Sequence, residues 1–391
     1  MISVAEAQAR MLGLATPLSA ETVPLNQAIG RYLAENIVAR RSQPAADLSA
    51  MDGYAIRFAD LPGPFALVGE SAAGVPFTDS LNAGDTVRIF TGAHVPEGAD
   101  TVLVQEDARA DGVRIYQDGE GPGAVAKHIR RKASDFGQGD FLVPSGTLVS
   151  AGAIAAIAMA GYGAVAVGSK PRVKIIATGD ELVPPGDLCD DAHLPSSNSI
   201  MLQAMLTPLP CVVVDAGIVR DDLALITAAF DDAADYDIIV TTGGASVGDH
   251  DFVQDALKAV GAEIDFWRVA MRPGKPLMAG RIGNTVVLGL PGNPSSAFVT
   301  AFLFLLPLVR HLAGAESAVP ALHSAPLTTD LGPGDGRTEY MRAMLENGAI
   351  TPFGKQDSGM ILPLVQANSL LVRPAGCAAT TVGDKAAYLA L

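Results

Sequence analysis

The stretch KPRVKIIATGDEL (residues 170–182) joins an apolar strand to a loop that carries two carboxylates, Asp180 and Glu181. The chain beyond it alternates between strands and helices up to about residue 314. Further strands are expected at 211–219, 237–242, 263–269 and 285–290, and helices near 198–206, 221–232 and 250–260. Such alternation is typical of βαβ units, whose strands form a mostly parallel sheet with ligand-binding loops after the strand carboxyl ends. The sequence therefore predicts an α/β multidomain protein with a central α/β domain at residues 169–314.

Three more regions surround this domain, as expected for 391 residues at roughly 100 to 200 residues per domain. Residues 1–43, together with about 132–168, predict a helical N-terminal and linker domain that opens on an amphipathic helix. Residues from about 44 to 131 are rich in glycine and proline and predict an inserted β-rich domain. Short strands punctuated by glycine at 315–391 predict a small C-terminal β-barrel.

Composition excludes several classes of protein. Lys and Arg number 27 against 42 Asp and Glu, for a net charge of −15, which argues against a general nucleic-acid or anionic-membrane binder. Glu6 and Arg10 interrupt the N-terminus where a signal peptide needs an apolar run, and Pro307 lies in the apolar stretch 297–309, which we expect to be buried core. The three cysteines are far apart and predict no disulfide framework. These features favour a cytoplasmic protein without nucleic-acid or membrane partners.

Charge is segregated along the α/β domain. Residues 215–265 hold twelve acids and only two cations, whereas 272–276 (RPGKP) places Arg272 and Lys275 around a rigid turn. Such a turn suits a phosphate or another oxyanion, and loop carboxylates after strands, such as Asp221, Asp249 and Asp251, suit Mg²⁺. Solvated helix faces and a surface hairpin would explain the same charges. The functional interpretation is a metal-assisted reaction on a phosphorylated substrate.

The loop at 241–248 (TTGGASVG) supports two interpretations. Its glycines and hydroxyls, at the end of an expected strand and before a helix, form an arrangement that cradles anions. The segment 244–248 also fits the GxSxG pattern of a serine hydrolase, with Ser246 as the nucleophile. The chain has no HGGG-like oxyanion segment, so the hydrolase is the weaker alternative.

Six motifs in order resemble one known family. They are SAMDGYA (49–55), TGA (91–93), TGDEL (178–182), TGGASVG (242–248), RPGKP (272–276) and LPGNP (290–294). Together they resemble the molybdopterin molybdenumtransferases, the MoeA proteins related to the E domain of gephyrin. The C-terminal β region matches the family in layout, although more weakly in sequence. The resemblance therefore extends over essentially the whole chain.

The resemblance implies a cytoplasmic, homodimeric enzyme of molybdenum cofactor biosynthesis. Such an enzyme inserts molybdate into adenylylated molybdopterin and releases AMP with the help of Mg²⁺ as the divalent cation. Three alternatives stay open within this resemblance: a molybdopterin adenylyltransferase, a tungsten-directed paralogue, and a scaffold that binds without turnover. A molybdopterin adenylyltransferase is also a possible partner.

The matching motifs indicate which residues of this sequence correspond to the family's site. The resemblance implies catalytic roles for Asp52, Thr91, Asp135, Arg272 and Lys275. It implies substrate binding by Thr242, Gly243, Gly244, Ser246, Pro291, Asn293, Pro294, Arg342 and Ser358. It implies metal binding by Glu181, Asp221 and Asp251. One departure is Arg272, where the family often has lysine, so a planar fork replaces a point charge.

Overall fold

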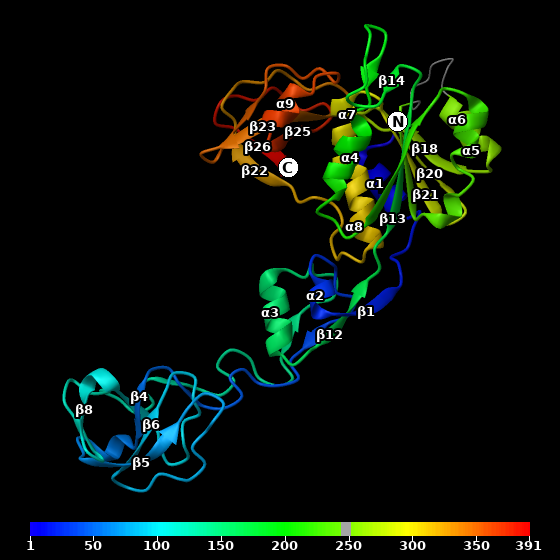
Figure 1. Cartoon of the computed structure of the whole chain (residues 1–391). Coiled ribbons are helices and arrows are strands. Elements are labelled where there is room, and N and C mark those ends of the chain that lie inside the picture. The colour runs from blue at the N-terminus through cyan, green and yellow to red at the C-terminus, as the bar shows by residue number, and fades with distance from the viewer. Residues whose placement is uncertain (244–251) are drawn as a thin grey trace. The chain divides into compact units, whose positions relative to one another are not determined.

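The computed structural model describes residues 1–243 and 252–391 and divides into two compact units. The larger unit comprises Met1–Glu35, Ser145–Ser150 and Val165–Leu391, and the smaller comprises Asn36–Pro144 and Ala151–Ala164. Figure 1 shows the elements of both. Each unit is described separately below.

The larger unit contains the predicted α/β sheet. Its six strands follow the order β16 (Val212–Val219), β13 (Arg172–Thr178), β17 (Ile238–Thr242), β21 (Thr285–Leu290), β20 (Pro276–Ile282) and β18 (Glu263–Arg268). The first four strands pair in parallel, and β20 is antiparallel to both of its neighbours. Five strands thus run the same way, and the predicted mostly parallel sheet is confirmed.

Helices cover both faces of this sheet because alternate strand residues point to opposite sides. Ile175 and Val240 pack with α1 (Val4–Leu12), α4 (Asn198–Leu206), α7 (Pro294–Thr300) and α8 (Leu306–Leu312). Ile176 and Ile239 pack with α5 (Leu223–Ala228) and α6 (Phe252–Ala259) on the other face. Figure 1 shows the two helical layers with the sheet between them.

The apolar stretch near residue 300 is a core helix. A π-helical turn, Ala301–Leu305, joins α7 to α8, and in the described residues Pro294–Leu312 is the one helix apolar and long enough to cross a membrane. Its most apolar window is 83% buried inside the protein, which confirms the prediction of buried core. Asn293 is the N-cap of this helix and Pro294 is its first helical residue, where the missing N–H costs nothing.

The C-terminal region forms a second six-stranded sheet in the larger unit. Its path is β19 (Met271–Arg272), β23 (Thr338–Glu346), β25 (Ser369–Arg373), β26 (Lys385–Ala390) and β22 (His323–Pro326), with β24 (Ala349–Pro352) paired to β23. A bridge between Leu327 and Ile350 connects the β22 and β24 ends, and the short helix α9 (Leu362–Gln366) follows β24. Because β19 pairs with β23, the RPGKP turn is attached directly to this sheet.

The N-terminal part differs from the expected helical domain. Within residues 1–43 only α1 and the single turn α2 (Leu25–Ala28) are α-helical, whereas β1 (Ala20–Pro24) pairs with β12 (Ala164–Gly168). Thr22 and Val23 are β-branched and Pro24 lacks an N–H, so this segment favours a strand over a helix. Within the second part of this predicted domain, about 132–168, the structure has one α-helix in the described residues, α3 (Ala151–Met159).

The smaller unit is rich in β-strands, as predicted. Its main sheet follows the order β7 (Thr101–Val104), β4 (Gly53–Ile56), β6 (Asp85–Ile89), β5 (Phe65–Ser71), β9 (Arg114–Gln117) and β8 (Ala108–Asp111). Two short pairs accompany it, β3 (Leu48–Ser49) with β10 (Ile129–Arg130) and β2 (Ile37–Val38) with β11 (Phe141–Val143). This unit also has 3-10 turns at Phe58–Asp60 and Gln105–Asp107. The larger unit adds a 3-10 turn at Ala233–Asp235 and the short pair β14 (Leu182–Val183) and β15 (Leu194–Pro195).

Candidate active site

The carboxyl edge of the α/β sheet gathers loops from four parallel strands. The loops after β13 and β16 are linked by Asp180, whose Oδ1 accepts hydrogen bonds from the Arg220 Nε and the Asp221 backbone N–H, both at 3.3 Å. The Glu181 carboxylate lies against Gly179 in the same loop. Two of the three predicted metal ligands, Glu181 and Asp221, are therefore on adjoining loops at the predicted edge.

Close backbone contact fixes the next loop. Gly243 follows β17 with φ +99°, and a Cβ there would lie 2.2 Å from the Thr178 carbonyl oxygen at the end of β13. Only glycine combines this conformation with so close an approach. The predicted substrate-binding residues Thr242 and Gly243 thus lie directly beside the TGDEL loop.

Asn198 joins two of the predicted substrate loops, and the sequence analysis missed it. At the start of α4, its Nδ2 donates to the Thr242 Oγ1 at 2.8 Å and to the Gly292 carbonyl at 2.7 Å. Its Oδ1 is buried and, like the Oγ of neighbouring Ser199, has no hydrogen-bond partner in the described part of the chain. Both residues follow a polar loop outside every motif. The contacts of Asn198 become visible only in the structure, where the ends of β17 and β21 lie close together.

The C-terminal sheet adds a loop to this region. Ser358 accepts a hydrogen bond from the Asn293 Nδ2 on its Oγ at 3.0 Å and another from the Ser295 N–H on its carbonyl at 3.1 Å. The loop that carries Ser358 therefore lies against the N-terminal end of α7. Asn293 and Ser358, two predicted substrate-binding residues 65 positions apart, are in direct contact.

Arg342 is an unusual buried cation. It lies on β23, its exposed fraction is 0%, and its Nη2 donates to the Asp357 carbonyl at 2.9 Å. Its Nε and Nη1 have no hydrogen-bond partner in the described residues. Burial lowers the pKa of its guanidinium, although the nearby Asp357 carboxylate opposes this shift. Unsatisfied buried donors are costly, and they indicate a position where an anion would be stabilised.

The two cations of the RPGKP turn differ in their partners. Arg272 Nη1 lies 3.5 Å from Glu339 Oε1, and the other oxygen of Glu339 accepts a hydrogen bond from Arg373 at 3.1 Å. The Lys275 side chain is exposed and forms no hydrogen bond or ion pair with the described residues. Because Gly274 packs against Thr300 with φ +101°, the turn is fixed in place. Arg272 is thus partly neutralised, and Lys275 keeps its full charge for a ligand.

The smaller unit brings Asp52 and Thr91 together. Asp52 Oδ1 accepts hydrogen bonds from the Thr91 backbone N–H at 2.7 Å and from its hydroxyl at 2.9 Å. These two bonds, the backbone one first, lower the pKa of the Asp52 carboxyl, and the positive charge of Arg88 adds to the effect. Asp135, the third predicted residue of this unit, donates its backbone N–H to the Gln43 carbonyl at 3.0 Å and is exposed.

The donor chemistry fits a hard cation at the strand edge. No three His, Cys, Asp or Glu side chains within residues 1–243 and 252–391 cluster closely enough to hold a metal ion. Glu181 and Asp221 nevertheless supply the carboxylate oxygens that Mg²⁺ prefers. The third predicted ligand, Asp251, lies outside the described residues, as do Asp249, Gly244 and Ser246, the residue on which the hydrolase alternative depends.

Models of three family regions match this chain. They are the MoeA N-terminal region (domain I and II) at residues 2–161, the probable molybdopterin binding domain at 174–311, and the MoeA C-terminal region (domain IV) at 324–391.

Relatives and solved structures match along nearly the whole length. A molybdopterin molybdenumtransferase of Haemophilus influenzae is 34% identical, and the matched region covers 95% of this chain and 94% of the relative. A molybdopterin molybdenumtransferase 2 of Mycobacterium tuberculosis is 35% identical, with 96% of each chain covered. The crystal structure of a molybdopterin biosynthesis moeA protein from Pyrococcus horikoshii superposes with a TM-score of 0.84 at 27% identity and covers 100% of both chains.

Proposed function

The chain belongs to the molybdopterin molybdenumtransferase (MoeA) family, and from this premise we propose that it inserts molybdate into adenylylated molybdopterin, with release of AMP and assistance from Mg²⁺. It is a molybdotransferase of molybdenum cofactor biosynthesis. The adenylylated substrate, the cation and the residue roles below are the proposal.

Cations without partners on an acidic protein carry the proposal. Lys275 forms no ion pair in the described part of the chain, and buried Arg342 keeps two donors unused, although the net charge is −15. Molybdate is a dianion and the substrate carries linked phosphates, so both ligands need local positive charge. We assign Lys275 to molybdate and Arg342, with Ser358, to a substrate oxyanion.

The loops at the strand edge position the substrate. Thr242 and Gly243, with Gly244 and Ser246 after them, would bind it through hydroxyl and backbone N–H groups, and Pro291, Asn293 and Pro294 form the neighbouring wall. Asn198 holds Thr242 and the 291–294 loop at a fixed separation. We assign Arg272 a secondary part, because Glu339 already offsets its charge.

Glu181, Asp221 and Asp251 are the residues we expect to hold Mg²⁺. Such an ion supplies positive charge that stabilises the departing phosphate of AMP. Without Mg²⁺, these carboxylates would repel an anionic substrate. A site that only binds anions, without turnover, would therefore gain nothing from them.

We assign Asp52 to orient a ligand. Its pKa lies below the ordinary value because Thr91 donates two hydrogen bonds to it, and a weakly basic carboxylate removes protons poorly. It stays ionised and accepts hydrogen bonds from substrate or water. Asp135 is assigned to the same task.

Thr91→Val should move the acid limb of the pH–rate profile. The variant keeps the backbone N–H but loses the hydroxyl, so the pKa of Asp52 rises towards its ordinary value. Asp52 then becomes protonated at a higher pH, and kcat/KM begins to fall at a higher pH than in the wild type. Thr91→Ser, which retains a hydroxyl, is the control. Identical acid limbs in both variants would contradict this role of Thr91.

We further propose a cytoplasmic homodimer that receives its substrate from a molybdopterin adenylyltransferase. Two parallel reactions separate the proposed activity from that of the adenylyltransferase itself. One supplies adenylylated molybdopterin, molybdate and Mg²⁺, and the other supplies ATP and molybdopterin. AMP and active cofactor in the first reaction alone support insertion, whereas adenylylation in the second supports the alternative. Tungstate in place of molybdate tests for a tungsten-directed enzyme.

A further inference from the structure

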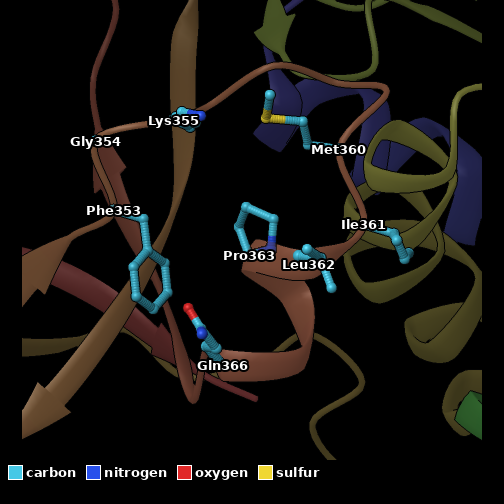
Figure 2. Close-up of a pocket in the computed structure, with 8 residues that line it drawn as sticks. All are labelled: Phe353, Gly354, Lys355, Met360, Ile361, Leu362, Pro363 and Gln366. Atoms are coloured by element: carbon cyan, nitrogen blue, oxygen red, sulfur yellow. The ribbon is translucent and has the colours of Figure 1, made fainter.

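A cavity lies beside the loop that carries Ser358. Its volume is about 540 Å³, and all of its lining residues belong to the segment 353–366, between β24 and the end of α9 (Figure 2). Cavities of a few hundred Å³ are the size of small-molecule sites. Ser358 lies in this segment, but none of the eight lining residues belongs to a predicted site motif.

The walls of this cavity are apolar. Phe353, Met360, Leu362 and Pro363 line it, and the exposed fraction of Leu362 is 73%. The backbone of Phe353 is fixed, because its N–H donates to the Arg342 carbonyl at 3.0 Å and its carbonyl accepts from Gln356 at 2.7 Å. Figure 2 shows Phe353 and Pro363 on neighbouring sides of the cavity. An aromatic side chain in the wall suits the face of a planar ring.

Two polar side chains complete the lining. The Lys355 ammonium and the Gln366 carboxamide form no hydrogen bond or ion pair in the described part of the chain. A carboxamide offers both donors and an acceptor to the edge of a heterocycle, and an ammonium binds phosphate. Carboxylates are absent from the eight lining residues, so nothing there repels an anion.

We propose that this cavity binds a planar heteroaromatic ring that carries a phosphate. The inference rests on the proposed function, whose substrate contains two such groups, the adenylate and the pterin phosphate. Residues 356–359 connect Lys355 to Met360 and include Ser358, so the cavity adjoins the loop already assigned to the substrate. The same loop thus holds an oxyanion on one side and a ring on the other.

Equilibrium binding to the full-length protein tests this, without molybdate, Mg²⁺ or turnover. The ligands are AMP, adenosine and dihydroneopterin monophosphate, so the adenylate and pterin sources are distinguished. Gln366→Phe fills the cavity, and Val365→Phe, on the same helix but outside the lining, is its control. Lys355→Gln removes the ammonium, and Lys385→Gln on β26 is its control.

We expect Gln366→Phe to weaken binding of the phosphorylated ring by about tenfold or more, and Lys355→Gln by about fivefold to tenfold, with both controls unchanged. Adenosine binding should not respond to Lys355→Gln. Equal affinities in Gln366→Phe and Val365→Phe, or failure of both phosphorylated rings to bind at millimolar concentration, would overturn the inference. The insertion assay is independent: normal insertion with unaffected binding rejects the cavity alone, and selective binding without insertion rejects the proposed function alone.

Discussion

Lys275→Met is expected to lower the rate of molybdenum insertion by about 10²- to 10³-fold, the usual loss when a fixed group that stabilises charge in the transition state is removed. The Lys275 side chain has no partner in the described residues, so its removal leaves no carboxylate unpaired. The free energy of unfolding should therefore change by less than about 0.5 kcal/mol. AMP release and cofactor formation measure the rate, and thermal unfolding measures stability.

Lys385→Met is the control for this variant. It removes another exposed lysine of the larger unit, on β26 and outside every predicted site motif. Its insertion rate should equal that of the wild type. A Lys275→Met enzyme that keeps half of the wild-type rate or more would show that molybdate is held elsewhere.

Arg342→Met is expected to separate activity from stability. Insertion should fall by about 100-fold, because the variant loses the two donors that we assign to a substrate oxyanion. The free energy of unfolding should stay the same or rise by up to about 2 kcal/mol, since an apolar side chain replaces a buried charge that forms no ion pair with the described residues. If both results are obtained, arginine at this position lowers stability and serves function. Denaturant unfolding measures the free energy of unfolding, and the insertion assay measures the activity.

Arg373→Met is the matched control. Arg373 is also buried, at 9% exposure on neighbouring β25, but it pairs with Glu339 at 3.1 Å and also donates to the Gly332 carbonyl. Its removal leaves the partly buried Glu339 carboxylate less well paired and should destabilise the protein by about 3 kcal/mol. If Arg342→Met loses as much stability as Arg373→Met, Arg342 is a structural residue and its assignment to an anion is wrong.

The α/β domain could be predicted from its sequence because its signals are local. Apolar runs such as 173–178 and 285–290 are bounded by glycine loops, and the carboxyl ends of parallel strands share one edge. The prediction failed at 20–24, where the β-branched residues favour a strand whose partner, β12, is distant in the sequence. The closed C-terminal barrel and the four-domain division stay predictions.

The site was only partly predictable, for a physical reason. Motifs led to the prediction of Asp52, Thr91 and Lys275, because each lies in a short loop with a recognisable sequence motif, and their roles stay predictions. They did not reveal that Glu339 shares the charge of Arg272, nor that Asn198 joins two loops, because both contacts form only after distant strands pair. The eight residues that line the cavity within 353–366 were missed for the same reason, since an apolar cavity has no residue spacing to detect.

The most direct test of this account is a single-turnover reaction of the full-length protein with adenylylated molybdopterin, in which AMP and molybdenum cofactor are measured together. The account predicts one AMP per cofactor formed, with AMP release that depends on both molybdate and Mg²⁺ and is nearly absent in Lys275→Met. AMP release at the same rate without molybdate, or cofactor formation without AMP, would contradict it.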